Sequence, residues 1–172
     1  DARNRTVAMY APSKTFNLAG LVGSYHIIYN SYLRDRVMAA SSKSHYNAMN
    51  VLSMYALIGA YKPEGYEWVD ELNQVLASNI EYFCDYVDEH FEGVSYSRPQ
   101  GTYMVFLDCT EWCREHGRDI QWLLDEGARV GVGYQDGRPF HGPCHIRVNL
   151  ALPLSRVREA CDRLDRYVFN AR

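Results

Sequence analysis

The chain has 172 residues, and 47% of them are hydrophobic and 23% charged, which is the composition of a globular protein of one domain or parts of two. The formal net charge is −3, with no basic run, so no nucleic-acid partner is expected. No apolar stretch is long enough to cross a bilayer and no leader is visible, so we expect no membrane partner.

The first third of the chain alternates short extended and helical patterns. Its residue pattern predicts a strand, a helix, a polar loop and a second helix, over 24–29, 32–40, 41–47 and 48–60. Pro63-Glu64-Gly65 is the clearest break, and we place a domain boundary there, between residues 1–62 and 63–172.

Apolar residues then recur at three- and four-residue steps from Trp68 to Phe91. This stripe predicts one helix of about seven turns, at 3.6 residues per turn. Gly93 is expected to end it.

Beyond Gly93, strand and helix patterns interleave, which indicates a mixed α/β chain. Strands are predicted over 94–97, 102–108, 128–132 and 145–152, and a loop over 133–143. Asp119 can cap a helix that ends at Gly127, and a last helix is expected to begin near Pro153.

The five cysteines are an odd number and widely scattered, which is typical of reduced thiols in a cytoplasmic protein. A metal-like spacing occurs in Cys109-x₃-Cys113-x₂-His116, with Cys144-His145 further on. It is looser than the paired spacings of zinc sites, and Cys109 ends an apolar run, so we expect no metal.

Two motifs carry a resemblance to a known family. Residues 11–21 read APSKTFNLAGL and include Lys14, and residues 137–153 read GRPFHGPCHIRVNLALP and include Arg147. They resemble the cofactor-lysine segment and the G-x-x-F…R-x-N-x-A-x-P stretch of fold-type I pyridoxal-phosphate enzymes, the aminotransferase class I/II superfamily. Phe16-Asn17 after the lysine is similar to the family's cystathionine β-lyase-like branch.

The resemblance implies an α/β fold, the C-terminal portion of the fold-type I PLP-dependent transferase fold. Residues 1–62 are then the end of the large cofactor domain, and residues 63–172 the small α+β C-terminal domain. Lys14 is implied to hold the cofactor, pyridoxal 5'-phosphate (PLP), and Arg147 to bind the carboxylate of an amino-acid substrate. A homodimer is implied too, because the family's active site lies at a dimer interface.

These residue types suit that chemistry. A lysine amine can bond to an aldehyde cofactor and later move a proton as a general base. The planar arginine fork binds a carboxylate through two parallel hydrogen bonds. Without the motifs, Lys14 reads as a solvated lysine and Arg147 as an exposed strand arginine. Alternation with Ile146 and Val148 predicts that Arg147 points to the opposite face of its strand.

Other positions match the family less directly. Asn17, Tyr103, Phe140 and Asn149 are expected to support the backbone and the packing, and His45 is a weak candidate for lining a neighbouring subunit's site. Two positions depart from the family. Val22 stands where many aminotransferases carry a phosphate-binding arginine, and His141 stands where a glycine usually follows the phenylalanine.

The family's phosphate-binding helix, ring-stacking aromatic and acidic partner of the pyridine nitrogen lie upstream of the lysine and outside this sequence. We therefore expect the isolated chain to bind little cofactor and to be inactive. The leading hypothesis for the intact protein is a C–S β-lyase that converts cystathionine or cysteine to a thiol, a keto acid and ammonia. The alternatives are a class I/II aminotransferase and a non-catalytic, effector-sensing domain of a transcription regulator.

Overall fold

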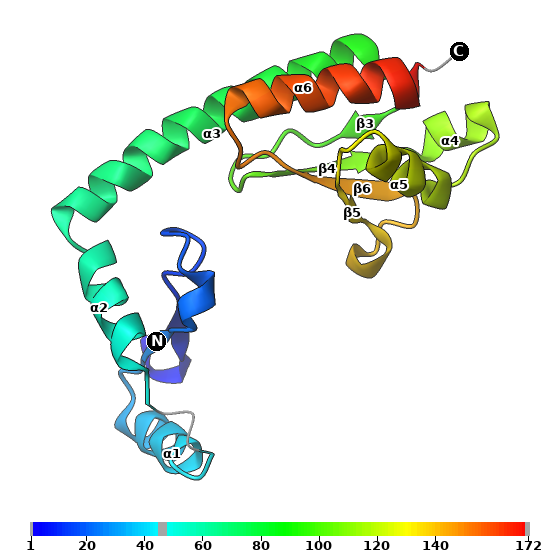
Figure 1. Ribbon diagram of the computed structural model, residues 1–172. Coiled ribbons are helices and arrows are strands. Elements are labelled where there is room, and N and C mark those ends of the chain that lie inside the picture. The colour runs from blue at the N-terminus through cyan, green and yellow to red at the C-terminus, as the bar shows by residue number, and fades with distance from the viewer. Residues whose placement is uncertain (1, 45–47, 171–172) are drawn as a thin grey trace. The chain divides into compact units, whose positions relative to one another are not determined.

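The computed structural model describes residues 2–44 and 48–170 (Figure 1). The chain divides into two compact units, Asp1–Leu72 and Asn73–Arg172, which we call the N-terminal and C-terminal units. Across the described ranges, no helix combines the length and apolar character of a membrane span.

The N-terminal unit consists of short elements. They are the 3-10 turn η1 (Ala2–Arg5), β1 (Ala8–Tyr10), η2 (Ala19–Leu21), β2 (Tyr25–Ile27), α1 (Ser31–Ser41) and α2 (Val51–Ala60). The predicted strand and both predicted helices are confirmed, whereas β1, which pairs antiparallel with β2, was not predicted. Part of the predicted loop, with His45, lies outside the described residues.

Asparagine side chains begin both of these helices. Asn30 accepts a hydrogen bond from the amide of Leu33, and Asn50 accepts one from the amide of Ser53 at 2.9 Å. The cap at Asn50 explains why α2 begins three residues after the predicted start.

The long helix predicted from the apolar stripe is α3 (Pro63–His90). It begins at Pro63, because proline has the backbone angle of a first helical residue and needs no amide partner there. After the helix, Gly93 has a φ of 79°, in the left-handed region that glycine adopts without strain.

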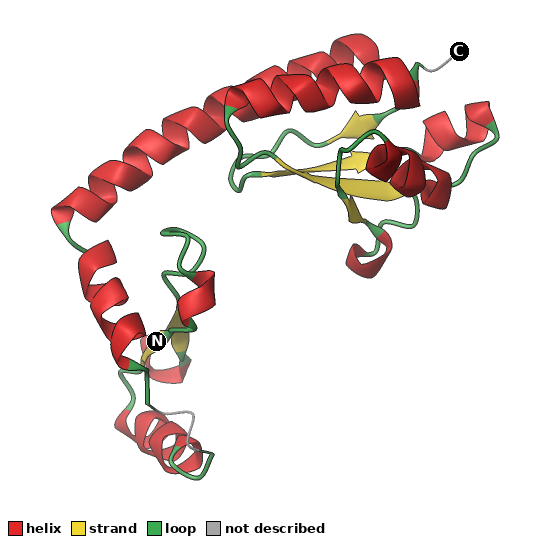
Figure 2. Ribbon diagram, in the orientation of Figure 1, coloured by secondary structure: helices red, strands yellow, loops and turns green. Residues whose placement is uncertain are grey.

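The C-terminal unit joins helices to one antiparallel sheet of strand order β3-β4-β6-β5. Its elements after α3 are β3 (Ser95–Tyr96), β4 (Met104–Asp108), α4 (Thr110–His116), α5 (Ile120–Arg129), β5 (Gln135–Asp136), η3 (Arg138–Phe140), β6 (His145–Asn149), α6 (Leu154–Leu164) and a π-helical turn, η4 (Asp165–Phe169). The C-terminal part of α3 and helix α6 run along the sheet (Figures 1 and 2).

The two central strands alternate buried and partly exposed residues. Val105 pairs with Val148 and Leu107 pairs with Ile146, and all four side chains belong to the hydrophobic core. Helices α3 and α6 contribute further core residues. Each fully buried side chain of this kind contributes roughly 1.5–3 kcal/mol, so this face holds the unit together.

The predicted strand over 128–132 is wrong, and so is the predicted helix end at Gly127. Helix α5 continues to Arg129, and Gly127 is buried within it. A Cβ on Gly127 would overlap the Tyr134 ring, whose hydroxyl donates a hydrogen bond to the carbonyl of Leu123. This glycine therefore permits close packing and does not end the helix.

Helix α4 was not predicted, and it contains most of the metal-like cysteine spacing. Cys109 and Cys113 are buried in the core, and His116 stacks on Trp112 with ring centroids 4.3 Å apart. Burial is the largest cause that raises the pKa of Cys113, to about 12. The spacing of Cys109, Cys113 and His116 therefore reflects side chains that pack on one side of a helix.

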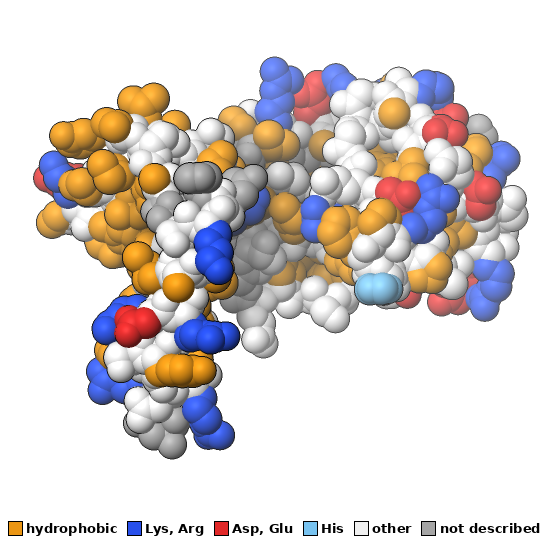
Figure 3. Space-filling view, turned by 90° about the horizontal axis from the view of Figure 1, so that it is seen from below, with side chains coloured by type: hydrophobic (Ala, Val, Ile, Leu, Met, Phe, Trp, Pro, Cys, Tyr) orange, Lys and Arg blue, Asp and Glu red, His pale blue; other side chains and the backbone are white. Residues whose placement is uncertain are grey.

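The N-terminal unit exposes much apolar surface. Val51, Leu52, Tyr55 and Ile58 of α2 have exposed fractions of 61%, 71%, 70% and 56%. Figure 3 shows apolar side chains gathered over this unit, in the left part of the view. Contiguous apolar surface of this kind is normally covered by further protein.

Candidate functional site

Lys14 lies in the turn that follows β1. The Phe16 amide donates to the Pro12 carbonyl at 2.9 Å, and Asn17 has a φ of 54°, so the backbone reverses directly after the lysine. The Lys14 side chain is exposed. No hydrogen bond or ion pair to its amine occurs within residues 2–44 and 48–170.

An aromatic cluster supports this turn. Phe16 makes edge contacts with Tyr61 and Tyr66, with ring centroids 5.4 and 6.1 Å apart. The Tyr25 and Tyr61 hydroxyls are 3.2 Å apart. This hydrogen bond is the largest cause that raises the pKa of Tyr61 to about 12, and burial adds to it. No local pattern joins Phe16 and Tyr25 to Tyr61 and Tyr66, because the two pairs lie far apart in the chain.

Val22 is 80% exposed and has a φ of 42°. The left-handed region is unusual for a branched side chain and marks local backbone strain. An exposed valine offers no charge and no hydrogen-bond donor, so this position cannot serve a phosphate as an arginine would.

Arg147 lies on the face of β6 opposite the core, as its alternation with Ile146 and Val148 predicted. Across the sheet it pairs with Phe106 of β4 and with Gln135 of β5, so the three side chains form one row on the open face.

Two side chains hold the Arg147 guanidinium. Its Nε donates to Oε1 of Gln135 at 2.7 Å, and Nη2 donates to the same oxygen. Its Cζ lies 3.9 Å from the centroid of the Phe140 ring. The sequence placed Gln135 in a loop, and only the strand pairing reveals it as a neighbour of Arg147.

The turn that carries Phe140 depends on two unusual backbone positions. His141 has a φ of 62°, which explains why glycine is usual at this position in the resembled family. A Cβ on Gly142 would overlap the Phe106 and His145 rings, so the turn lies directly on the sheet. This packing fixes the place of Phe140 beneath Arg147.

Asn79 of α3 anchors the chain just beyond Arg147. It is 1% exposed, and its Nδ2 donates to the carbonyls of Leu150 and Leu152 at 2.9 and 2.8 Å. Sequence analysis missed this residue, although a polar side chain within the apolar stripe was a usable signal. Asn149 has the supporting role expected of it, because its Oδ1 accepts from the amide of Ala151.

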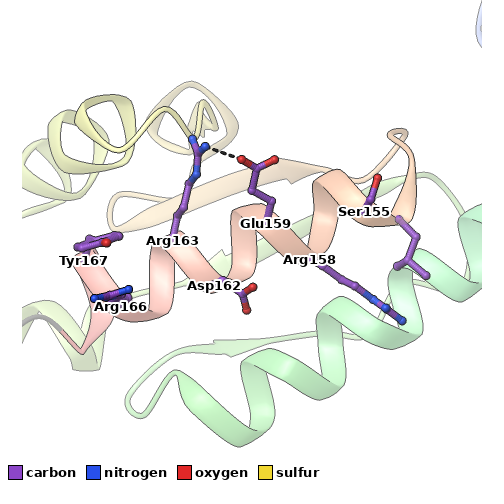
Figure 4. Close-up of a pocket in the computed structure, with 8 residues that line it drawn as sticks. Ser155, Arg158, Glu159, Asp162, Arg163, Arg166 and Tyr167 are labelled. Atoms are coloured by element: carbon purple, nitrogen blue, oxygen red, sulfur yellow. Dashed lines mark hydrogen bonds and ion pairs between the residues drawn. The ribbon is translucent and has the colours of Figure 1, made fainter.

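Other parts of the C-terminal unit carry hollows that Arg147 does not line. A cavity of about 340 Å³ lies among Phe83, Gly131, Leu150 and α6. A shallower one, of about 600 Å³, follows the outer face of α6, where Arg163 pairs with Glu159 (Figure 4). The second is a solvated helix face, on which Arg158 and Arg166 lie over tyrosine rings.

Comparison with known proteins places these features in a family. Residues 1–164 match the family described as Aminotransferase class I and II. The chain belongs to this family. Its fold is accordingly the C-terminal portion of the fold-type I PLP-dependent transferase fold, as the sequence predicted.

Three relatives show how far the similarity extends. The chain is 30% identical to Protein MalY of Escherichia coli, over 92% of this chain and 40% of that protein. It is 26% identical to Cystathionine beta-lyase PatB of Bacillus subtilis, over 95% and 42%. The PLP-containing crystal structure of cystalysin from Treponema denticola superposes with a TM-score of 0.83 at 26% identity, over 95% of this chain and 41% of cystalysin. The chain thus spans about two fifths of these proteins.

Proposed function

We propose that this chain is the C-terminal part of a PLP-dependent C–S β-lyase acting on cystathionine or cysteine. The observation that carries the proposal is the exposed Lys14 amine in its SKTFNLAGL turn, which has no hydrogen-bond or ion-pair partner among the described residues. The same chain presents Arg147 on an open sheet face. Relatives named as cystathionine β-lyases and the apolar, exposed Val22 favour a lyase.

In this proposal, residues 1–62 complete the large cofactor domain and residues 63–172 form the small domain. The intact protein is a cytoplasmic homodimer without a nucleic-acid or membrane partner. The apolar surface of α2 supports the idea that further protein covers the N-terminal unit.

The residues present fit one end of the cofactor. The free Lys14 amine suits the aldehyde group, while the described residues around it include no cationic cradle for the phosphate. When bound, PLP supplies an electron sink for the bonding electrons of the substrate Cα. Lys14 would hold the cofactor, and its amine would take the proton from Cα of the substrate.

Arg147 orients the substrate in this proposal. Its guanidinium would bind the α-carboxylate through two parallel hydrogen bonds, which would fix the orientation of the amino acid. The overall reaction of such a lyase would break the Cβ–S bond, release the thiol and, with water, give a keto acid and ammonia.

Product analysis of the intact protein tests the reaction class. A lyase releases pyruvate from cystathionine without a keto-acid acceptor, and Lys14→Ala reduces this release by about 10²–10⁴-fold, the usual contribution of a positioned base. Pyruvate release that persists in Lys14→Ala would contradict the proposal.

An aminotransferase is the second candidate, and the family's own description favours it. In that case keto-acid formation depends on an added keto-acid acceptor. For this 172-residue chain alone, we expect added PLP to give no absorbance change that depends on Lys14, because the phosphate and ring sites are missing.

A further inference from the structure

We infer that Gln135 is a positioning residue for Arg147. Gln135 fixes which edge of the Arg147 guanidinium faces a substrate carboxylate, and it leaves the positive charge of the arginine in place. This inference rests on the proposed role of Arg147. It concerns how the carboxylate site is built.

The β5–β6 pairing brings the side chains of Gln135 and Arg147 together. Gln135 and Arg147 are directly opposite in the β5–β6 pairing, so their side chains emerge on the same face of the sheet. Oε1 of Gln135 accepts from Nε and from Nη2, which occupies one edge of the guanidinium. The Phe140 ring covers one plane of the group. What remains is the edge formed by Nη1 and the second Nη2 proton.

That remaining edge suits a carboxylate. An arginine fork binds two carboxylate oxygens through two parallel N–H groups. Within the described ranges, Gln135 is the hydrogen-bond acceptor that Arg147 contacts. The amide therefore turns a flexible arginine into a fork of fixed direction.

The neutral charge of the Gln135 side chain also matters. An amide oxygen accepts hydrogen bonds without carrying charge, so Arg147 keeps its full positive charge for the substrate. A glutamate at position 135 would form an ion pair with the same edge and compete electrostatically with an incoming carboxylate. A neutral acceptor is thus the partner that a carboxylate-binding arginine requires.

The nearest carboxylate along the chain is engaged elsewhere. Asp136 pairs with Arg138, whose amide and Nε donate to it at 2.8–3.0 Å. Successive strand residues point to opposite faces, so the Asp136 side chain is turned away from the Arg147 face. The two residues of β5 therefore differ in their partners. Asp136 neutralises the charge of Arg138, whereas Gln135 leaves the charge of Arg147 in place.

Kinetics of the intact protein provide the main test. Gln135→Glu is expected to raise KM for the amino-acid substrate roughly tenfold or more, and Gln135→Ala to raise it several-fold, with kcat changed less than about twofold. Gln121→Ala is the matched control, because its Oε1 accepts from Arg138 at 2.9 Å and not from Arg147. A purely structural role would lower the amount of active enzyme and leave KM unchanged.

The Arg147→Ala variant distinguishes the carboxylate-binding role of Arg147 from the positioning role of Gln135. If it leaves KM unchanged, the carboxylate role of Arg147 fails, and this inference fails with it. If it raises KM strongly while Gln135→Glu and Gln135→Ala match the parent protein, the proposed function stands and the role of Gln135 is wrong.

A spectroscopic readout on the 172-residue chain does not depend on activity. Nitrogen-15 NMR of arginine side chains should show an Arg147 Nε–H signal that exchanges slowly with water in the parent chain. Gln135→Ala should abolish that protection, and Gln121→Ala should leave it intact. A signal equally protected in Gln135→Ala would overturn the inference.

Discussion

The two units of this chain differ in how they use their apolar residues. The core cluster lies between Phe83 and Phe169, entirely within the C-terminal unit. In the N-terminal unit, the buried residues of the described part are Pro12, Ile28 and Ser53, while helix α2 is apolar on nearly every side and largely exposed. Similar composition therefore yields a self-contained core in one unit and uncovered surface in the other.

This difference bears on the proposed chemistry. Arg147 lies on a sheet whose opposite face is a closed core, so its surroundings are held by the unit's own packing. Lys14 lies in a unit without such a core and depends on a turn and an aromatic cluster. We expect the carboxylate site to persist in this chain alone, and the lysine site to need covering protein.

The largest expected effect comes from matched leucine truncations. Leu107→Ala should lower the free energy of unfolding by about 2–5 kcal/mol, because Leu107 is 0% exposed and its removal leaves a cavity. Leu52→Ala, at a side chain that is 71% exposed, should change it by less than about 0.5 kcal/mol. Urea unfolding measures both, and equal losses would show that the N-terminal unit has a core of its own.

The next effect concerns Asn79. Asn79→Ala should lower the free energy of unfolding by about 1–3 kcal/mol, because it leaves the carbonyls of Leu150 and Leu152 without their hydrogen-bond donor. Asn73→Ala, at an exposed position of the same helix, is the control. A stability equal to that of the control would mean that other contacts hold the chain beyond Arg147.

The helix caps of α5 and α2 allow a second comparison of the two units, with a smaller expected change in stability. Asp119 caps α5 through the amide of Trp122 at 2.8 Å, and Asp119→Ala should lower the stability of the main unfolding transition by about 1 kcal/mol. Asn50→Ala removes the equivalent cap of α2 and should leave that transition unchanged, because α2 lies outside the core. Differential scanning calorimetry of the two variants tests whether the units unfold separately.

The smallest effect is a pH dependence in the N-terminal unit. The pKa of Tyr61 is raised to about 12 in the folded chain. The contribution of protonated Tyr61 to the free energy of unfolding is therefore fully present below the ordinary tyrosine pKa of about 10. This contribution is lost as the pH rises from about 10 through about 12, because the tyrosine of the unfolded chain releases its proton at the lower pH. Tyrosine-labelled carbon-13 NMR should show Tyr61 titrating late, and Tyr25→Phe should return it toward the ordinary value.

Local pattern predicted much of this fold. The stripe from Trp68 to Phe91, the cap at Asp119 and the strand around Arg147 all lie where the sequence placed them, because helix and strand periodicity are local properties. The family, too, could be recognised from the short motifs around Lys14 and Arg147.

Two features of the fold depend on contacts that local pattern does not predict. Gly127 read as a helix end but lies inside α5, because its role depends on Tyr134 packing against it. Helix α4 was missed, since its seven residues carry few periodic positions and are held by burial of Trp112 and Cys113.

Local motifs were sufficient to predict the family and the fold class, and to nominate Lys14 and Arg147 for the proposed chemistry. The surroundings of Arg147, namely Gln135 and Phe140, emerged only from the structure. Strand pairing and a turn folded back on the sheet bring together residues that no spacing rule connects, because side-chain neighbours across a sheet depend on register.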